Sequence, residues 1–395
     1  MEYLNYNNIT LKDNKIDYVL SFTAIFQSFL SLLQQYLLYC LHLPESIAGN
    51  TRIIGSAIPI IISMIFVLRR NKRYVLYTYI PVAIILLLTN IMWPTRWPYM
   101  KDDVLKFLLP IVIPTGLCVA SVRNLKVFLN SCFLVSLLSS LIALLFLYSY
   151  LSGSYTSDKN YNMAFSYALL FPTAILFSQD NFIWKLLSIV LLIEMLALGS
   201  RGALITVLTY MVISYKWNKR SGLKIILYVL LLITATYFLF EPIVYTLTNL
   251  FDQIGVNSRS LNLYLNGEVF SHDSGRFDLY EETRKMIDTS PLFGYGIWAD
   301  REFFGIYCHN IYLELLLDFG YAGGYFFIIT TISFLIYVYF KLNKSLKLVF
   351  ILFVVCAIMP LTASGSYLTS YNFSLMLGVI YLLYKQVSKN RDIIY

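Results

Sequence analysis

The chain has 395 residues, of which 58% are hydrophobic and only 13% are charged. A soluble core of this size cannot enclose so much apolar surface, so the composition excludes a soluble globular protein and makes a lipid bilayer the solvent. The formal net charge of +8 reflects how Lys and Arg are divided between the two membrane faces, so it does not indicate nucleic-acid binding.

About twelve apolar runs are long enough to cross the roughly 30 Å hydrocarbon layer as helices. Their length, without alternation of polar and apolar residues, excludes the strands of a membrane barrel. We therefore expect an all-α polytopic membrane protein. The polar start of the chain lacks the pattern of a cleaved signal peptide, so the first run is expected to be an anchor. The runs are approximately Tyr18–Leu41, Ile53–Leu68, Tyr74–Met92, Val104–Ser121, Val127–Tyr150, Tyr161–Phe177, Ile183–Leu198, Ala203–Tyr215, Leu223–Phe240, Tyr321–Phe340, Leu348–Thr362 and Tyr371–Tyr384.

The distribution of basic residues predicts the orientation. Most Lys and Arg fall on the side that holds both termini, which is therefore expected to be cytoplasmic. The chain forms a single integral domain over residues 1–395, and its one long loop, residues 241–308, is expected to face outward. Within this loop the stretch "DSGRFDLYEETRKMI" predicts a short amphipathic helix, capped by Asp273 or Ser274.

The stretch "EMLALGSRGALI", from Glu194 to Ile205, interrupts an apolar region with small residues around Arg201. Charged residues at membrane depth are costly and usually face a cavity or a partner. The small residues and the following helix N-terminus favour an anion at Arg201. Alternatively, Arg201 lies in an outer turn and extends toward the headgroups. Glu194 lies seven residues earlier, on the same helix face if the helix continues, and is either the counter-ion of Arg201 or part of a site.

Two further candidates face the same side as Arg201 in this topology. Arg276 lies in the long loop, where it is either a solvated surface residue or half of an arginine clamp, with Arg201, for a phosphate or diphosphate. His309-Asn310 lies where the chain re-enters the membrane. Histidine titrates near neutrality, so it suits proton transfer from a hydroxyl, although a lone histidine at a helix end is also a common structural residue.

The five cysteines (Cys40, Cys118, Cys132, Cys308 and Cys356) are scattered and form no CxxC pair. This pattern indicates buried small side chains and predicts neither a metal site nor a cofactor.

Three blocks together resemble a known family: "GSRGALI" (Gly199–Ile205), "DSGRFDLYEETRKMIDTSPLFGYGIW" (Asp273–Trp298) and "HNIYLELLLDFGYAGG" (His309–Gly324). In order and spacing they are similar to the shared region of bacterial O-antigen polymerases (Wzy-type) and O-antigen ligases. The resemblance covers residues 160–340. It implies a glycosyltransferase of the bacterial inner membrane that uses undecaprenyl-diphosphate-linked glycans as donor and acceptor, without metal or cofactor, at an active site on the periplasmic side.

The resemblance also implies residue roles. Arg201 and Arg276 would stabilise charge on the leaving diphosphate. His309 would be the general base that deprotonates the acceptor hydroxyl. Asn310 and Glu314 would support it, and Tyr280 would contact substrate. The block "SDKNYNMAFSYALLFP" adds candidates for contacts with sugar or phosphate, namely Lys159, Asn160 and Tyr161.

The modest length of the chain and its Tyr- and Phe-rich outward segments favour a polymerase. The pattern His-Asn, nine residues, Gly-x-x-Gly, which ends at Gly320 and Gly323, is that of the ligases. A third hypothesis is a flippase or other transporter. It is disfavoured because the charged candidate residues gather at one face of the membrane. A flippase and a chain-length regulator are the partners that the family implies for a polymerase.

Overall fold

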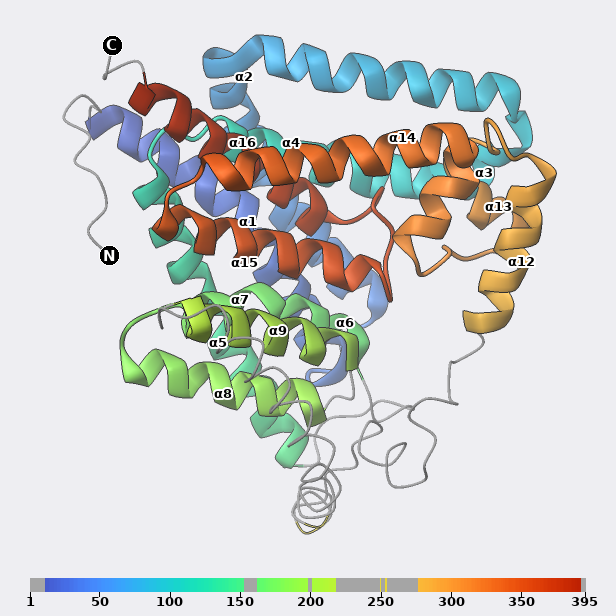
Figure 1. Ribbon diagram of the computed structural model, residues 1–395. Coiled ribbons are helices and arrows are strands. Elements are labelled where there is room, and N and C mark those ends of the chain that lie inside the picture. Colours follow the sequence, from blue (N-terminus) through green and yellow to red (C-terminus); the bar gives the residue numbers. More distant parts are fainter. Residues whose placement is uncertain are drawn as a thin grey trace. The chain divides into compact units, whose positions relative to one another are not determined.

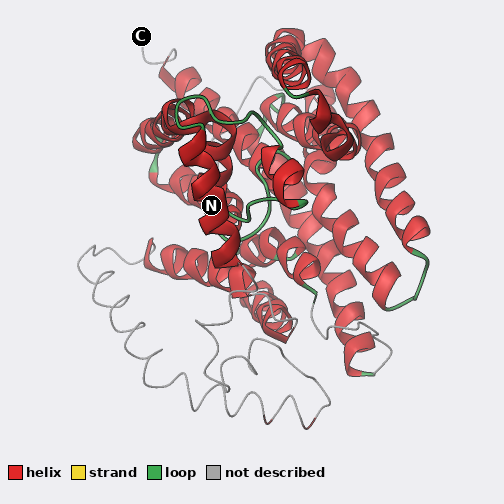
Figure 2. Cartoon of the chain, turned by 90° about the vertical axis from the view of Figure 1, so that its right-hand side faces the viewer, coloured by secondary structure: helices red, strands yellow, loops and turns green. Residues whose placement is uncertain are grey.

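The computed structural model describes residues 11–152, 162–197, 201–217 and 276–391, with the single positions 249 and 253. Every regular element in these ranges is a helix, as expected (Figures 1 and 2). The first half holds α1 (Leu11–Tyr39), α2 (Glu45–Met92), η1 (Pro94–Arg96), α3 (Trp97–Asp102), η2 (Asp103–Val112), α4 (Ile113–Ala120) and α5 (Leu125–Leu151). The second holds α6 (Met163–Ala168), α7 (Leu170–Phe177), α8 (Phe182–Ala197), α9 (Arg201–Trp217), α12 (Arg276–Thr289), α13 (Ala299–Phe304), α14 (Ile311–Lys341), α15 (Lys344–Leu361) and α16 (Tyr371–Arg391).

Within the described residues, 6 helical stretches are long and apolar enough to cross a membrane. They are Asp13–Tyr39, Glu45–Met92, Pro94–Ala120, Leu125–Leu151, Ile311–Lys341 and Lys344–Leu361. Met163–Phe177 and Gly202–Tyr215 are apolar but shorter, and the expected run Leu223–Phe240 lies outside the described residues. A multi-pass helical membrane protein is therefore confirmed, whereas the number of twelve and the orientation stay predictions.

Helix α2 contains the two expected runs on either side of a break at Asn71. It runs through both predicted runs and the basic stretch between them as one helix of 48 residues, with non-helical backbone angles at Asn71 (φ −144°, ψ 46°). A straight helix of that length would measure about 72 Å, more than twice the thickness of the hydrocarbon layer. The interruption at Asn71 therefore separates two helical arms, and it lies between the two runs that the sequence predicts.

The chain divides into two groups, each with its own packing. The first comprises residues 1–27, 53–132 and 274–395, and the second comprises residues 28–52 and 133–273. In the first group α4 packs against α16 at close range, because a Cβ on Gly378 would lie only 2.6 Å from the carbonyl oxygen of Gly116. In the second group the rings of Phe146 and Phe165 stack at 4.0 Å inside a buried apolar cluster.

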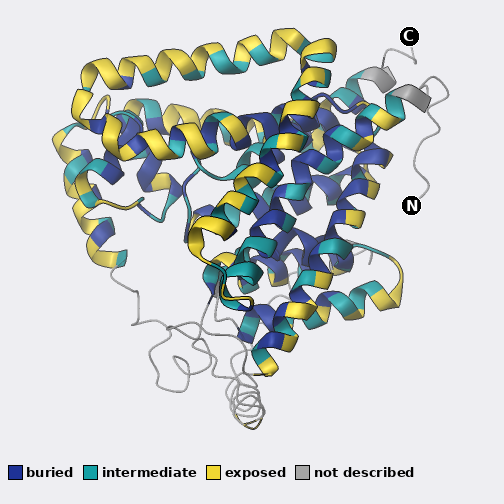
Figure 3. Ribbon diagram, turned by 180° about the vertical axis from the view of Figure 1, so that it is seen from behind, coloured by how far each residue is buried: buried dark blue, intermediate teal, exposed yellow. Residues whose placement is uncertain are grey.

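Exposed apolar side chains cover much of α2 beyond residue 53 and of α14 beyond residue 325 (Figure 3). In water such surfaces would be unstable, whereas lipid chains solvate them without cost. These two helices therefore present membrane-facing surface in the first group, which also contains the site described next.

Candidate functional site

The site forms where α14 begins. Asn310 is the N-cap of this helix, and its side-chain oxygen accepts hydrogen bonds from the backbone amides of Tyr312 (2.9 Å) and Leu313 (3.4 Å). His309 stands just outside the helix in the left-handed backbone region, with φ of 56°. Such a conformation is uncommon for a residue other than glycine and persists only where surrounding contacts hold it.

Two tyrosines contact His309. Its ring centroid lies 4.2 Å from that of Tyr307, and the Tyr280 hydroxyl donates a hydrogen bond of 3.4 Å to its backbone carbonyl. Its buried Nδ1 has no hydrogen-bond partner among the described residues. Burial and then the positive charges of Arg276 and Arg301 lower the pKa of His309 to about 4, with Asp300 acting in the opposite direction. The imidazole is therefore neutral at pH 7 and can accept a proton.

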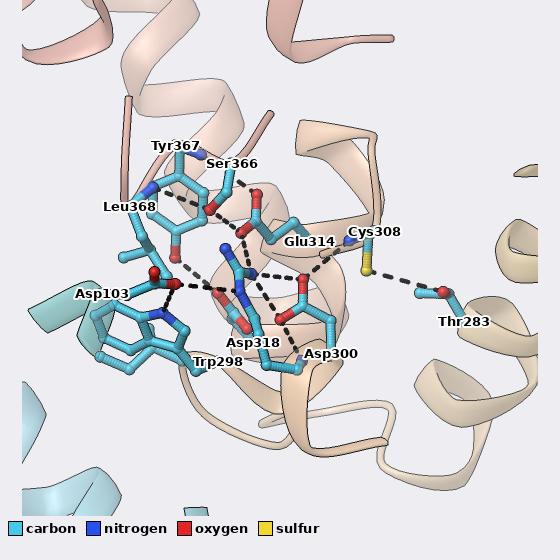
Figure 4. A network of polar contacts seen from close by, with 12 residues as sticks. Asp103, Thr283, Trp298, Asp300, Cys308, Glu314, Asp318, Ser366, Tyr367 and Leu368 are labelled. Atoms are coloured by element: carbon cyan, nitrogen blue, oxygen red, sulfur yellow. Dashed lines mark hydrogen bonds and ion pairs between the residues drawn. The ribbon is translucent and has the colours of Figure 1, made fainter. Parts of the chain in front are cut away.

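A buried ionic network lies next to the turn that contains Cys308 and His309 (Figure 4). Arg301, in α13, places its Nη1 atom 2.7 Å from Asp300 and 2.9 Å from Glu314. Its Nε atom lies 3.6 Å from Asp103, which also accepts a hydrogen bond of 3.1 Å from the indole of Trp298. Burial disfavours a charged Arg301, but the pKa is raised overall because Asp300 and Glu314 stabilise the guanidinium. Arg301 therefore stays protonated within the network.

The network continues from α14 into the connection between α15 and α16. Glu314 accepts a hydrogen bond from the Ser366 hydroxyl, and Asp318 accepts one of 2.7 Å from the Tyr367 hydroxyl. Glu314 and Asp318 are four residues apart, so both project from one face of α14. Both are almost fully buried, and these partners offset part of the cost of burying them.

One carboxylate joins the network to the histidine turn. An oxygen of Asp300 accepts a hydrogen bond of 3.0 Å from the backbone amide of Cys308. The backbone is thus held at three consecutive residues: at Cys308 by Asp300, at His309 by Tyr280, and at Asn310 by its own cap of α14. This arrangement accounts for the left-handed conformation of His309.

The turn before α13, residues 290–298, packs against a break in α14. Gly320 has φ of 67° and ψ of −176°, which no helix accommodates, so carbonyls in the preceding turn lose their usual partners. The turn satisfies them, because Tyr295 donates its amide to Leu317 and Gly296 donates its amide to Asp318, both at 2.8 Å. In return the Tyr321 amide donates to Pro291 at 2.6 Å.

A second buried arginine fixes the far side of this turn. The Nη1 atom of Arg96 donates to the carbonyls of three consecutive residues, Tyr295 at 2.5 Å and Gly296 and Ile297 at 3.2 Å. Its Nε atom lies 2.8 Å from Glu302, and its guanidinium lies 4.8 Å from the ring centroid of Trp93. A strong charged donor therefore fixes a stretch of irregular backbone next to the site.

The structure brings several predicted residues together. His309, Asn310, Glu314 and Tyr280 lie in one cluster, and Arg276, the first residue of α12, influences His309 through its charge. The expected amphipathic helix is confirmed as α12, although its predicted caps Asp273 and Ser274 lie outside the described residues.

The other predicted residues lie in the second group of the chain or outside the described residues. Glu194 is buried in α8, and its carboxylate has no hydrogen-bond partner in the described part of the chain. Its predicted counter-ion Arg201 opens α9, but the side chain of Arg201 is outside what the structure describes. Lys159, Asn160 and Tyr161 also lie outside the described residues, so their roles stay predictions.

Sequence reasoning missed much of the network, namely Asp103, Asp300, Arg301, Asp318, Ser366 and Tyr367. A signal existed for Asp318, because it follows Glu314 by four residues on an otherwise apolar helix. The adjacent charges of Asp300 and Arg301, within an aromatic stretch, were a second signal. Their partners come from distant parts of the chain and carried no pattern of their own.

Fold and site together define the class: a multi-pass helical membrane protein whose neutral histidine stands near two arginines at the end of a candidate span. Residues 186–328 match the protein-family model Wzy_C, described as O-antigen ligase. The match takes in Glu194, Arg201, Arg276 and His309 and covers a little over a third of the chain. It confirms the resemblance expected from the sequence and supports the O-antigen ligase and polymerase family. No curated protein matches the chain.

Proposed function

We propose that this protein is an O-antigen polymerase, a membrane glycosyltransferase that joins undecaprenyl-diphosphate-linked oligosaccharide units at the periplasmic face of the inner membrane. One observation carries the proposal: within the region that matches the O-antigen ligase family, His309 is held neutral at the start of α14 while Arg276 and Arg301 act on it. A proton acceptor beside cations is what transfer from a lipid diphosphate to a hydroxyl requires.

The proposed step replaces one bond of the anomeric carbon by another. The oxygen of the acceptor hydroxyl forms a bond to the anomeric carbon of the donor glycan, and the proton of that hydroxyl passes to His309. The bond between the anomeric carbon and the diphosphate oxygen breaks, and its electron pair leaves with undecaprenyl diphosphate. Arg276 and Arg201 stabilise the charge that develops on this leaving group.

The low pKa of His309 has a consequence for this step. A free imidazole with a pKa of about 4 is a weak base, because burial and the charges of Arg276 and Arg301 disfavour the imidazolium. A bound diphosphate neutralises part of that positive field. Binding of the donor therefore increases the basicity of His309 at the moment when a proton must be accepted, and the empty enzyme keeps the group neutral.

The groups that hold the turn then have supporting roles. Asp300 fixes the backbone at Cys308, and Tyr280 fixes the carbonyl of His309. Glu314 acts on Arg301 rather than on substrate, since its carboxylate is buried and bonded within the network. Lys159, Asn160 and Tyr161 are assigned to glycan or phosphate contacts, and Asn310 to the cap that orients the histidine.

A ligase that transfers the glycan to lipopolysaccharide core is the alternative. The family description and the His-Asn and Gly-x-x-Gly spacing favour it. Two features favour the polymerase: the modest length of the chain and two exposed aromatic residues in the helices α12 and α14. Phe277 is 64% exposed and Tyr312 is 47% exposed. Exposed rings stack against sugars, and a polymerase must hold a growing glycan on its surface.

The test uses purified protein in lipid nanodiscs with a synthetic undecaprenyl-diphosphate oligosaccharide. A polymerase lengthens the glycan and releases undecaprenyl diphosphate when this donor is the only substrate. A ligase releases undecaprenyl diphosphate only after lipopolysaccharide core is added, and a transporter releases none under either condition. Release that depends strictly on core would overturn the polymerase proposal.

Matched variants test the residue roles. Arg276→Gln and His309→Ala should each abolish lengthening, whereas Arg284→Gln, an exposed change on the same helix α12, should not. His42→Ala is the control for His309, because His42 is also a non-glycine residue with positive φ, at 52°. Arg201→Lys should also be impaired, because lysine lacks the planar fork of arginine. Normal polymer from the Arg276 and His309 variants would refute the mechanism.

A further inference from the structure

The turn that packs against the break in α14 carries two large apolar side chains on its tip. Leu292 is 62% exposed and Phe293 is 83% exposed. The tip is shaped by two hydrogen bonds between Ser290 and Gly294, one from the Gly294 amide at 3.1 Å and one from the Ser290 hydroxyl at 3.0 Å. These two side chains therefore project from an ordered turn whose conformation is set by its neighbours.

The position of the tip along α14 is fixed. Both Gly294 and Gly320 approach so closely that a Cβ on either would collide with the backbone of the other segment. The Tyr321 amide bonds to Pro291, and the Tyr321 hydroxyl donates to Asp288 at 2.8 Å. The tip thus lies at the level of residues 320–321, immediately before α14 becomes apolar and exposed.

The length of α14 places this level relative to a bilayer. From Tyr321 to Lys341 the helix rises about 30 Å, which equals the thickness of the hydrocarbon layer. Only 11% of its most apolar window is buried by the protein, which is the exposure expected of a surface that faces lipid. Tyr321 and Tyr325 stack at 5.9 Å at one end, and Lys341 closes the other. Tyrosine and lysine are the residues found where a span meets the headgroups.

We propose that Leu292 and Phe293 form an interfacial anchor that inserts into the headgroup region of the bilayer at the Tyr321 end of α14. The occupant of this surface is lipid, because the tip is continuous with a helix that lipid already surrounds. The anchor and the histidine turn are rigidly linked, since the same turn leads through α13 to Cys308 and His309. The anchor therefore sets the depth of the site relative to the membrane surface. This inference does not depend on which reaction the site performs.

The experiment measures depth by fluorescence quenching. Phe293→Cys is labelled with an environment-sensitive fluorophore and placed in nanodiscs of phosphatidylethanolamine and phosphatidylglycerol. The five native cysteines are all buried, so labelling is selective. Some of the nanodisc lipids carry a nitroxide, either near the headgroup or near the end of the acyl chain. Two controls bracket the result: Glu282→Cys, exposed on α12, and Ile332→Cys, 46% exposed near the middle of the α14 span.

At position 293 we expect emission shifted to shorter wavelength than at position 282, with stronger quenching by the headgroup nitroxide than by the chain-end nitroxide. Position 332 should show the reverse order, and position 282 should show little quenching by either. Water-like emission at position 293 without quenching overturns the proposal. Shifted emission without quenching by any lipid would show that protein covers the tip, and stronger quenching by the chain-end nitroxide would place the tip in the hydrocarbon core. Either result also overturns it, and Leu292→Cys provides an independent repeat.

Discussion

Replacing Gly320 by alanine tests the packing that supports the site. Gly320 has φ of 67° and ψ of −176°, a backbone conformation almost restricted to glycine, where a side chain costs about 1–3 kcal/mol. In addition, the new Cβ would collide with the backbone of Leu292 and Phe293, so the turn must move away. That movement breaks the three hydrogen bonds of Tyr295, Gly296 and Tyr321, each worth about 1 kcal/mol. We expect Gly320→Ala to lower the free energy of unfolding by about 4–6 kcal/mol in total.

Gly305→Ala separates the cost of a side chain at positive φ from the cost of displacing the turn. Gly305 also has positive φ, at 72°, but a Cβ there meets no atom within 4 Å. Its loss should be only about 1–2 kcal/mol. Unfolding is followed in mixed detergent and dodecyl sulfate micelles by tryptophan fluorescence, to which Trp93 and Trp298 near the turn contribute. Equal losses in the two variants would refute the description of the turn as packed against the break in α14.

The remaining predictions concern the charges. The acid limb of kcat/KM should lie near pH 4 rather than 6.5, because the neutral form of His309 is required and its pKa is lowered to about 4; a limb above pH 6 would contradict this. Arg276→Gln should raise that pKa, seen as a higher midpoint for modification of His309 by diethyl pyrocarbonate, with mass-spectrometric readout. Between pH 6.5 and about 4 the unfolded chain binds a proton at position 309 and the folded chain does not, so stability should fall with falling pH, and His309→Gln should flatten that slope. Arg301→Met should destabilise the protein by about 3–5 kcal/mol because it leaves buried carboxylates unpaired, whereas the exposed Arg284→Met should change stability by less than about 0.5 kcal/mol.

Local sequence patterns predicted the local structure of the site well. The amphipathic pattern after Gly275 predicted α12, and the His-Asn pair marked the true start of α14. The helix α12 follows from helical periodicity, which is a short-range pattern, whereas the capping of α14 by Asn310 was not predicted. The break at Gly320 was missed because a glycine within a helical pattern does not by itself mark a break, and only the partner turn shows why a glycine is required there.

The ionic network could not be predicted in the same way. Arg301 contacts Asp103 and Glu314, and Glu314 contacts Ser366, so its members are brought together only by the packing of helices distant in sequence. A single sequence does not indicate such contacts, because each residue by itself has the pattern of an ordinary charge in a loop or at a helix end.

Arg96 binds three consecutive carbonyls, and this affects how often the turn of residues 290–298 can open. A turn on a protein surface ordinarily opens and closes many times during one catalytic cycle, and its amides exchange with solvent quickly. Here Tyr295 and Gly296 have both their amides and their carbonyls engaged, the amides by α14 and the carbonyls by Arg96. Opening would require all of these bonds to break together. The turn thus behaves as a rigid part of the structure, and a ligand that binds against it must adapt to its shape.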